Sequence, residues 1–280
     1  MRCFLTAFLR GLLWAAVIPA LPAGPAVKPQ RIVSICMQGD QLLMQLVPRE
    51  RIVALSALAA DPDTSAHWQA ARGFPITHSG AEEIVRLNPD LVLVSPSSSL
   101  LTVAILKRLG LRVLELGIPT NFDELRDQIR LAGRSFGEEA RAEEIVKTMD
   151  ARLDRLKARR PPPAMRPTAL FYYQDRYTPG AHTFPDAILE AAGFRNLAPG
   201  DGGSASMEAI LMAHPNYLIL TRFRQGSPIM TQISETDPLI RKLETDFKNI
   251  KVISVSLRDL VSPDPSNLEL AETLQAQLRQ

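Results

Sequence analysis

The chain has 280 residues, of which 46% are hydrophobic and 22% are charged, and its formal net charge at pH 7 is +2. This length and composition suit a globular protein with one large domain or two domains of about 120 residues each. A charge balance so close to neutral excludes the strong basic field that attracts nucleic acid, so no nucleic-acid partner is expected.

The N-terminal 26 residues have the layout of an export signal. Positive charge near the start is followed by a short apolar stretch, residues 11–18, and then by small residues that offer cleavage sites after Ala23 or Ala26. The apolar stretch is too short to span a bilayer stably, so we expect residues 1–26 to be removed on export. An uncleaved membrane anchor is the alternative.

Two cysteines occur in the sequence, Cys3 and Cys36. Cys3 lies within the expected signal and would be removed with it. The mature chain would then retain Cys36 alone and could form no internal disulfide. We therefore expect stability to depend on the hydrophobic core, which a chain of this size can build, and the sequence leaves the role of Cys36 open.

Strands and helices alternate in the first half of the sequence. Apolar runs predict strands over residues 31–35, 51–55, 91–94 and 112–116. A loop is predicted over residues 36–40, and helices over residues 41–47, 61–72, 82–87 and 101–109. This alternation is typical of a parallel sheet with helices packed on its faces.

Two helices are predicted in the middle of the chain. The first covers residues 121–132 with Asn121 as its N-cap, and the second covers residues 138–159 with acidic residues at its start and basic residues at its end. At 1.5 Å per residue, the second helix would extend about 33 Å, which is enough to cross one lobe and reach another. Three prolines, residues 161–163, end it.

The alternation starts again after these prolines. Strands are predicted over residues 169–173, 217–220 and 252–255, and helices over residues 184–192, 207–212 and 268–278, with a flexible glycine-rich loop over residues 200–204. We therefore predict two doubly wound α/β lobes with central parallel sheets, bridged by one long helix. The N-terminal lobe would cover residues 27–137, the linking helix residues 138–160, and the C-terminal lobe residues 161–280.

Two segments, residues 81–94 and 206–220, resemble each other. The first reads A-E-E-I-V-R-L-N-P-D-L-V-L-V and the second reads S-M-E-A-I-L-M-A-H-P-N-Y-L-I-L. Each places a glutamate at the start of a short helix, followed by a proline turn and an apolar strand. This repeat predicts two similar lobes, each with an acidic residue at one corner: Glu82 in the first lobe and Glu208 in the second.

Ligands of open α/β sheets bind beyond the carboxyl ends of the strands, so the loops at those ends supply the candidate contacts. Aromatic rings pack on flat macrocycles or catechols, and arginine pairs with the anionic oxygens of a chelate. Ordinary core packing is the alternative for the aromatic residues. The candidate ligand contacts are Met37, Asp40, Trp68, Ser97, Tyr173, Tyr177, His182, Arg222 and Arg224.

Motifs for catalysis or for direct metal binding are not evident in the sequence. The four histidines are scattered, and the glycine-rich and nucleophile motifs of nucleotide-binding and hydrolytic enzymes do not occur. We therefore predict no catalytic residue, no resident metal and no cofactor. Direct binding of zinc, manganese or iron, through loops that converge in the fold, remains an alternative, as does an exported two-lobe enzyme or sensor.

Several short motifs carry a family resemblance together. In chain order they are R-I-V-S at 31–34, E-R-I-V-A at 50–54, the first glutamate segment, L-K-R-L-G-L-R-V at 106–113, G-F-R-N at 193–196 and S-M-E at 206–208. With these motifs the chain resembles the periplasmic binding proteins of ABC importers for cobalamin, ferric siderophores and haem. The resemblance covers nearly the whole expected mature chain.

The resemblance implies a class III periplasmic binding protein fold, in which one rigid helix bridges two lobes that hinge little around a ligand cleft. It implies a monomeric solute-binding protein in the periplasm that delivers a metal chelate to an ABC permease dimer in the inner membrane. Glu82 and Glu208 would pair with arginines of that permease. The loop at residues 36–40 and the segment at residues 259–265 depart from the family pattern, so the identity of the ligand stays open.

Overall fold

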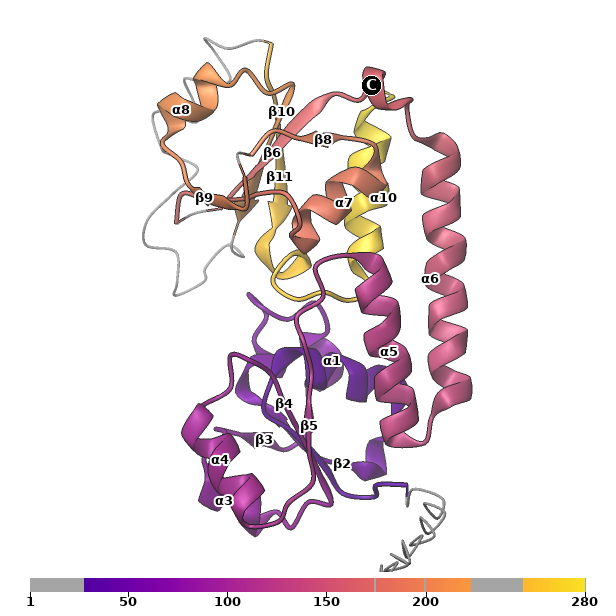
Figure 1. Ribbon diagram of the computed structural model, residues 1–280, viewed down its shortest axis with the longest axis vertical. Coiled ribbons are helices and arrows are strands. Elements are labelled where there is room, and N and C mark those ends of the chain that lie inside the picture. The colour runs from indigo at the N-terminus through magenta and orange to yellow at the C-terminus, as the bar shows by residue number, and fades with distance from the viewer. Residues whose placement is uncertain (1–27, 174, 199, 223–248, 280) are drawn as a thin grey trace, which may run out of the picture.

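The computed structural model describes residues 28–173, 175–198, 200–222 and 249–279 (Figure 1). The expected export signal, residues 1–26, lies outside the described residues. Two parallel sheets lie one above the other in Figure 1, and the long helix α6 (Glu139–Arg159) runs along one side of both. None of the helices in the described ranges is both long enough and apolar enough to cross a membrane.

The lower part of Figure 1 is a parallel sheet of five strands in the order β3-β2-β1-β4-β5. In chain order the strands are β1 (Ile32–Ser34), β2 (Ile52–Ser56), β3 (Ile76–Thr77), β4 (Leu91–Val94) and β5 (Val113–Glu115). Its helices are α1 (Met37–Leu46), α2 (Trp68–Ala71), α3 (Ala81–Arg86) and α4 (Leu100–Arg108), and α5 (Phe122–Phe136) then leads to α6.

The upper part contains a parallel sheet of four strands in the order β11-β10-β6-β8. These strands are β6 (Thr168–Tyr172), β8 (Arg195–Asn196), β10 (Tyr217–Arg222) and β11 (Lys251–Ser256). A separate antiparallel pair joins β7 (Tyr177–Pro179) to β9 (Gly202–Ser204). The helices are α7 (Phe184–Ala192), α8 (Met207–Met212) and α10 (Asn267–Gln277).

The two sheets share one topology, since β8-β6-β10-β11 repeats the order of β2-β1-β4-β5. The proline turn of each glutamate segment is also repeated: Asn88 and His214 both adopt φ 48°, immediately before the proline. Asp90 then accepts hydrogen bonds from the backbone N–H groups of Gln30 and Arg31, at 2.6 and 3.0 Å. The repeat seen in the sequence is therefore a repeat of backbone conformation and of hydrogen bonding.

Asn216 occupies the corresponding place in the second sheet. Its Oδ1 accepts hydrogen bonds from the backbone N–H and the hydroxyl of Thr168, at 2.8 and 2.9 Å. Thr168 is the first residue of β6, just as Gln30 and Arg31 immediately precede β1. In both lobes, the residue after the proline fixes the start of a central strand.

The helix α1 begins earlier than the sequence predicts, because residues 36–40 are not a loop. Met37 is the first residue of the helix and Cys36 is its N-cap, with no side-chain capping bond. Gly39 permits this, since a Cβ there would lie 2.9 Å from the Cβ of Leu93 on β4. The small residue lets the first turn of α1 pack directly against the sheet, and the turn is buried as a result.

The glycine-rich segment at residues 200–204 is not a loop throughout. Gly202–Ser204 form β9, which pairs with β7. The prediction of a flexible loop over these three residues was therefore wrong. A Cβ at Gly180 would lie 2.1 Å from the backbone nitrogen of Gly202, so this close backbone approach requires glycine. The short strands β3 and β8 were not predicted either.

One hydrophobic cluster extends through both sheets and the helices beside them. It contains Leu43 of α1, Phe136 of α5, Met149 of α6 and Leu274 of α10, each at most 1% exposed. At the junction, the rings of Phe122 and Phe184 lie 5.0 Å apart at the starts of α5 and α7. One face of each sheet therefore shares a continuous core with the other sheet, whereas the opposite face of each sheet has a smaller cluster of its own.

Replacing Asn216 with alanine should lower the free energy of unfolding by about 1–2 kcal/mol, because the backbone N–H and the hydroxyl of Thr168 lose their acceptor. The substitution Asn216→Asp keeps the acceptor oxygen and copies Asp90 of the first lobe, so its stability should stay close to that of the wild type. Urea unfolding followed by circular dichroism measures both. Equal destabilisation by the two substitutions would contradict this account of the turn.

Candidate functional site

The carboxyl ends of the two sheets meet through a buried carboxylate, that of Asp264, which is 3% exposed. Gln45 of α1 donates a hydrogen bond of 2.6 Å to its Oδ2, and Nε2 of His67 lies 3.1 Å from its Oδ1. The backbone N–H of Ser266 donates a further bond of 2.8 Å to Oδ1. Asp264 follows β11, whereas its two side-chain partners belong to the first lobe, so this contact joins the lobes.

A second hydrogen bond extends this contact. The hydroxyl of Ser262 donates to Oε1 of Gln41 at 2.9 Å, and both residues are buried. We call the set of Gln41, Gln45, His67, Ser262 and Asp264 the polar seam. Its members come from two parts of the chain about two hundred residues apart, and Gln41, Gln45, Ser262 and Asp264 were not selected from the sequence as site residues.

The electrostatics of the polar seam favour a charged pair. The hydrogen bond to Asp264 raises the pKa of His67 despite partial burial of the ring. Burial alone would raise the pKa of Asp264, but its hydrogen bonds with His67 and Ser266 outweigh burial and lower it. A low carboxyl pKa beside a raised imidazole pKa stabilises the ionised form of the pair.

A pocket of about 620 Å³ opens beside the polar seam, between α2 of the first lobe and the end of β11 with α10 of the second. Trp68, a predicted ligand contact, lines it, and the guanidinium of Arg72 stacks over the Trp68 ring at 4.3 Å. Charged side chains of the second lobe line the opposite side, namely Arg258, Asp259 and Glu269.

The structure does not bring Met37 and Asp40 to the surface, because they lie in the first turn of α1 and not in a loop. Asp40 is 1% exposed, and its carboxylate accepts hydrogen bonds from the backbone N–H and the hydroxyl of Ser56, at 3.0 and 2.5 Å. Burial raises the pKa of Asp40 to about 7. Burial likewise raises the pKa of the Cys36 thiol to about 12.

The predicted contacts of the second lobe are partly brought together. The rings of Tyr173 and Tyr177 lie 5.9 Å apart, edge to face, at the turn between β6 and β7. The backbone N–H of Tyr173 donates to the carbonyl of Tyr177 at 2.8 Å. Burial raises the pKa of Tyr173 well above its usual range, so its hydroxyl stays protonated.

The remaining candidates lie apart from this pair. Arg222 is half-buried at the end of β10, and Arg224 lies outside the described residues. His182 is exposed immediately before α7, with φ 62°. Ser97 is exposed in the loop after β4, where its hydroxyl lies 2.8 Å from that of Ser95. Within the described ranges, no hydrogen bond or ring contact joins Trp68 or Ser97 to the tyrosine pair.

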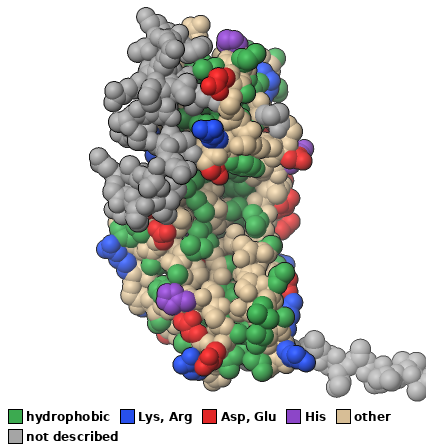
Figure 2. All heavy atoms as spheres, turned by 90° about the vertical axis from the view of Figure 1, so that its left-hand side faces the viewer, with side chains coloured by type: hydrophobic (Ala, Val, Ile, Leu, Met, Phe, Trp, Pro, Cys, Tyr) green, Lys and Arg blue, Asp and Glu red, His purple; other side chains and the backbone are tan. Residues whose placement is uncertain are grey.

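Glu82 and Glu208 lie in the first turns of the corresponding helices α3 and α8. The Glu82 side chain is 86% exposed and forms an ion pair of 3.3 Å with Arg86. Glu208 is exposed. Its pKa is lowered by a hydrogen bond from its own backbone N–H and, to a smaller extent, by a hydrogen bond with the side chain of Ser206. Figure 1 shows α3 and α8 on the side of the molecule opposite α6, and Figure 2 views that face.

Metal ligands do not gather in the described parts of the chain, where no group of three or more His, Cys, Asp or Glu side chains is placed to hold an ion. His67 contacts Asp264 in the polar seam, and the other three histidines are exposed at separate turns: His78, His182 and His214.

Comparison with known proteins identifies relatives of the chain. The sequence profile described as periplasmic binding protein matches residues 37–250. The cobalamin-binding protein of Halobacterium salinarum is 28% identical over 172 residues, which cover 61% of this chain and 47% of that protein, or about half its length. The uncharacterised ABC transporter substrate-binding lipoprotein YvrC of Bacillus subtilis is 24% identical over 204 residues, covering 69% and 64%.

Solved structures share the fold. The periplasmic heme-binding protein RhuT from Roseiflexus sp. RS-1 superposes with a TM-score of 0.71 at 20% identity, covering 88% of this chain and 97% of that one. The periplasmic vitamin B12 binding protein BtuF of Vibrio cholerae gives a TM-score of 0.67 at 16% identity, covering 90% and 97%. The predicted fold class, two α/β lobes in the class III arrangement, is confirmed.

The buried carboxyl of Asp40 should make stability depend on pH. Its pKa is about 7 in the folded chain and near the ordinary 3.8 in the unfolded chain, so the folded state holds an additional proton between these values. The free energy of unfolding should therefore fall as the pH rises through this window.

The substitution Asp40→Asn keeps the partners of Ser56 and removes the titration. Urea unfolding at about pH 5 and about pH 8 should show a smaller loss of stability in Asp40→Asn than in the wild type. Asp127→Asn, at an exposed aspartate of α5, is the matched control and should retain the wild-type dependence. An identical pH dependence in all three proteins would show that Asp40 is ionised throughout.

Proposed function

The chain belongs to the periplasmic binding protein family, and we propose that it is an exported, monomeric solute-binding protein that captures a metal chelate between its lobes and delivers it to an ABC import permease. The observation that carries this proposal is the duplicated corner: α3 and α8 present Glu82 and Glu208 at corresponding turns of two similar lobes. Two exposed carboxylates at a fixed separation suit a membrane partner that offers one arginine fork to each lobe.

The side chains at the carboxyl end of the second sheet suit a bulky, anionic ligand. Tyr173 and Tyr177 offer aromatic surface at the carboxyl end of the second sheet, and Arg222 ends the neighbouring strand β10. Aromatic rings pack on flat or extended ligands, and guanidinium groups pair with anionic oxygens. Relatives described as binding cobalamin and heme support macrocyclic cobalt or iron complexes as the candidate chelates, and ferric siderophores are a third candidate class.

The continuous core supports capture with little hinge motion. Opening the lobes would separate Phe122 from Phe184 and would remove donors from the buried carboxylate of Asp264. A buried charge that loses its partners is costly, so large opening is disfavoured. We therefore propose that the docking glutamates stay at a fixed separation. Ligand binding would then change mainly the conformation of the loops around the cleft.

Thermal unfolding of the chain from Val27 onward tests this function against cobalamin, haem, ferric siderophores and free zinc, manganese and iron ions. A chelate at one hundred times its dissociation constant should add about 2.7 kcal/mol of stability. A shift with free ions alone would favour direct metal binding, and no shift with any ligand would overturn the proposal.

With the chelate that shifts the melting temperature, Tyr177→Ala should weaken binding by about 1–3 kcal/mol, through loss of a packed aromatic contact. Met165→Ala removes a side chain from an exposed residue outside the cleft and should leave binding unchanged. Equal affinities of all three proteins, measured by calorimetry, would remove Tyr177 from the site.

Docking is tested by the double substitution Glu82→Ala and Glu208→Ala. Uptake of the same chelate through its permease should be lost, whereas its affinity for the isolated protein should be unchanged, because both glutamates lie outside the cleft loops. Glu50→Ala with Glu139→Ala removes two exposed carboxylates elsewhere and is the matched control. Normal uptake with the first pair would contradict the docking role.

A further inference from the structure

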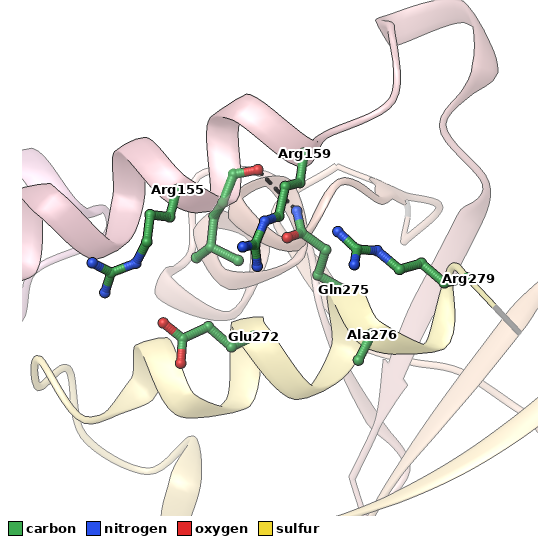
Figure 3. A pocket seen from close by; sticks show the side chains of 7 residues that line it. Arg155, Arg159, Glu272, Gln275, Ala276 and Arg279 are labelled. Carbon is green, nitrogen blue, oxygen red and sulfur yellow. Dashed lines mark hydrogen bonds between the residues drawn. The ribbon is translucent and has the colours of Figure 1, made fainter.

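A pocket lies on the outer side of the second lobe, between α6 and α10 (Figure 3). Its volume is about 380 Å³. Figure 1 shows α6 and α10 on the side opposite α3 and α8, so the pocket is remote from the proposed docking corners. The residues that line it are Arg155, Leu156, Arg159, Glu272, Gln275, Ala276 and Arg279.

Three arginines line this pocket, two from α6 and one from the residues that follow α10. Arg155 and Arg159 are four residues apart on α6 and therefore share one face of that helix. Arg279 follows α10 and reaches the pocket from the other side. Figure 3 shows the guanidinium groups of Arg159 and Arg279 on either side of the carboxamide of Gln275.

The described residues that line the pocket carry more positive than negative charge. Its one carboxylate, that of Glu272, already binds Arg152 through two hydrogen bonds of 2.9 and 2.8 Å. Those bonds lower the pKa of Glu272, and the nearby charges of Arg155 and Arg159 lower it further. None of the three pocket arginines forms an ion pair with a described residue at 4.0 Å or less; all three side chains are exposed, and Arg155 and Arg159 interact with Glu272 only at longer range.

The floor of the pocket is held in place. Gln275 is 5% exposed, and its Nε2 donates a hydrogen bond of 2.9 Å to the backbone carbonyl of Leu156 (Figure 3). This bond ties α10 to α6 directly beneath the arginines. Because α6 and α10 are held together, the backbone positions from which the arginines extend are fixed relative to each other.

Helix electrostatics do not account for the whole cluster. Basic residues in the last turn of a helix stabilise its negative end, which explains Arg159 and the neighbouring Lys157 on α6. Arg155 precedes that last turn, and nothing in the helix requires a cation there. Arg155, Arg159 and Arg279 place three like charges around one pocket, and an anion bound there would offset their repulsion.

We propose that this pocket binds a compact anion through phosphoryl oxygens, with Arg155, Arg159 and Arg279 as its ligands. Guanidinium forks match the geometry of phosphate and hold it through paired hydrogen bonds. The phosphoryl group can belong to a soluble phosphate compound or to a phospholipid headgroup, and both offer the same oxygens. This site is separate from the cleft and does not depend on which chelate the cleft binds.

Calorimetry with pyrophosphate, at an ionic strength of about 0.1 M to screen long-range attraction, tests the soluble source. Sedimentation with vesicles of phosphatidylglycerol, against vesicles of phosphatidylcholine, tests the headgroup. The test variant carries Arg155→Gln, Arg159→Gln and Arg279→Gln. The control variant carries Arg108→Gln, Arg134→Gln and Arg195→Gln, which removes the same charge from exposed residues elsewhere.

One pyrophosphate should bind per chain, with at least about tenfold weaker binding in the test variant and unchanged binding in the control. Binding to phosphatidylglycerol vesicles alone, with the same loss in the test variant only, would assign the site to a lipid headgroup. Equal losses in both variants would show attraction by net charge and would overturn the proposal. Absence of binding to pyrophosphate and to both kinds of vesicle would overturn it as well.

Discussion

The contact between the two lobes is the constraint on which the rest of this structure depends. Apolar side chains from α1, α5, α6, α7 and α10 form one cluster across the junction, and the polar seam closes it on the side of the cleft. The carboxylate of Asp264 is the critical member, because a charge that is 3% exposed is tolerated only while its donors stay in place. Both the apolar and the polar part of the junction therefore oppose separation of the lobes.

This junction gives the duplicated features of the lobes a fixed relation to each other. Asp90 and Asn216 anchor the central strands in the same way, and α3 and α8 follow from that shared geometry as equivalent corners. A partner that recognises both corners would then detect the relative position of the lobes. In a molecule that opens widely this relative position would vary, whereas the shared core and the polar seam of this protein oppose such a change.

The sequence predicted the elements that local patterns determine and missed those that depend on distant contacts. Strands such as Leu91–Val94 and the helix Glu139–Arg159 follow from apolar periodicity and charge order. The early start of α1 depends on the fit of Gly39 against Leu93, and β9 exists only because β7 pairs with it.

The polar seam joins Gln41 to Ser262 across 221 positions, so no local pattern in the sequence reveals it. Tyr173 and Tyr177 were both named as candidate ligand contacts, but their ring contact was not predicted. The burial of Asp40 was not predicted either, because Asp40 lies in a helical turn that was interpreted as a loop.

The position of Asp264 and α10 along the chain has a consequence for how the molecule acquires its structure. Asp264 and α10 follow, in order of synthesis, nearly everything that they contact, including α1, His67, α6 and α7. Contacts at such long sequence separation are slow to form, since a long loop must close before they contribute. Residues 28–222 can collapse earlier, but their junction stays incomplete until the segment around residues 260–277 arrives. The segment around residues 260–277 is therefore the part of the chain that completes the contact between the lobes.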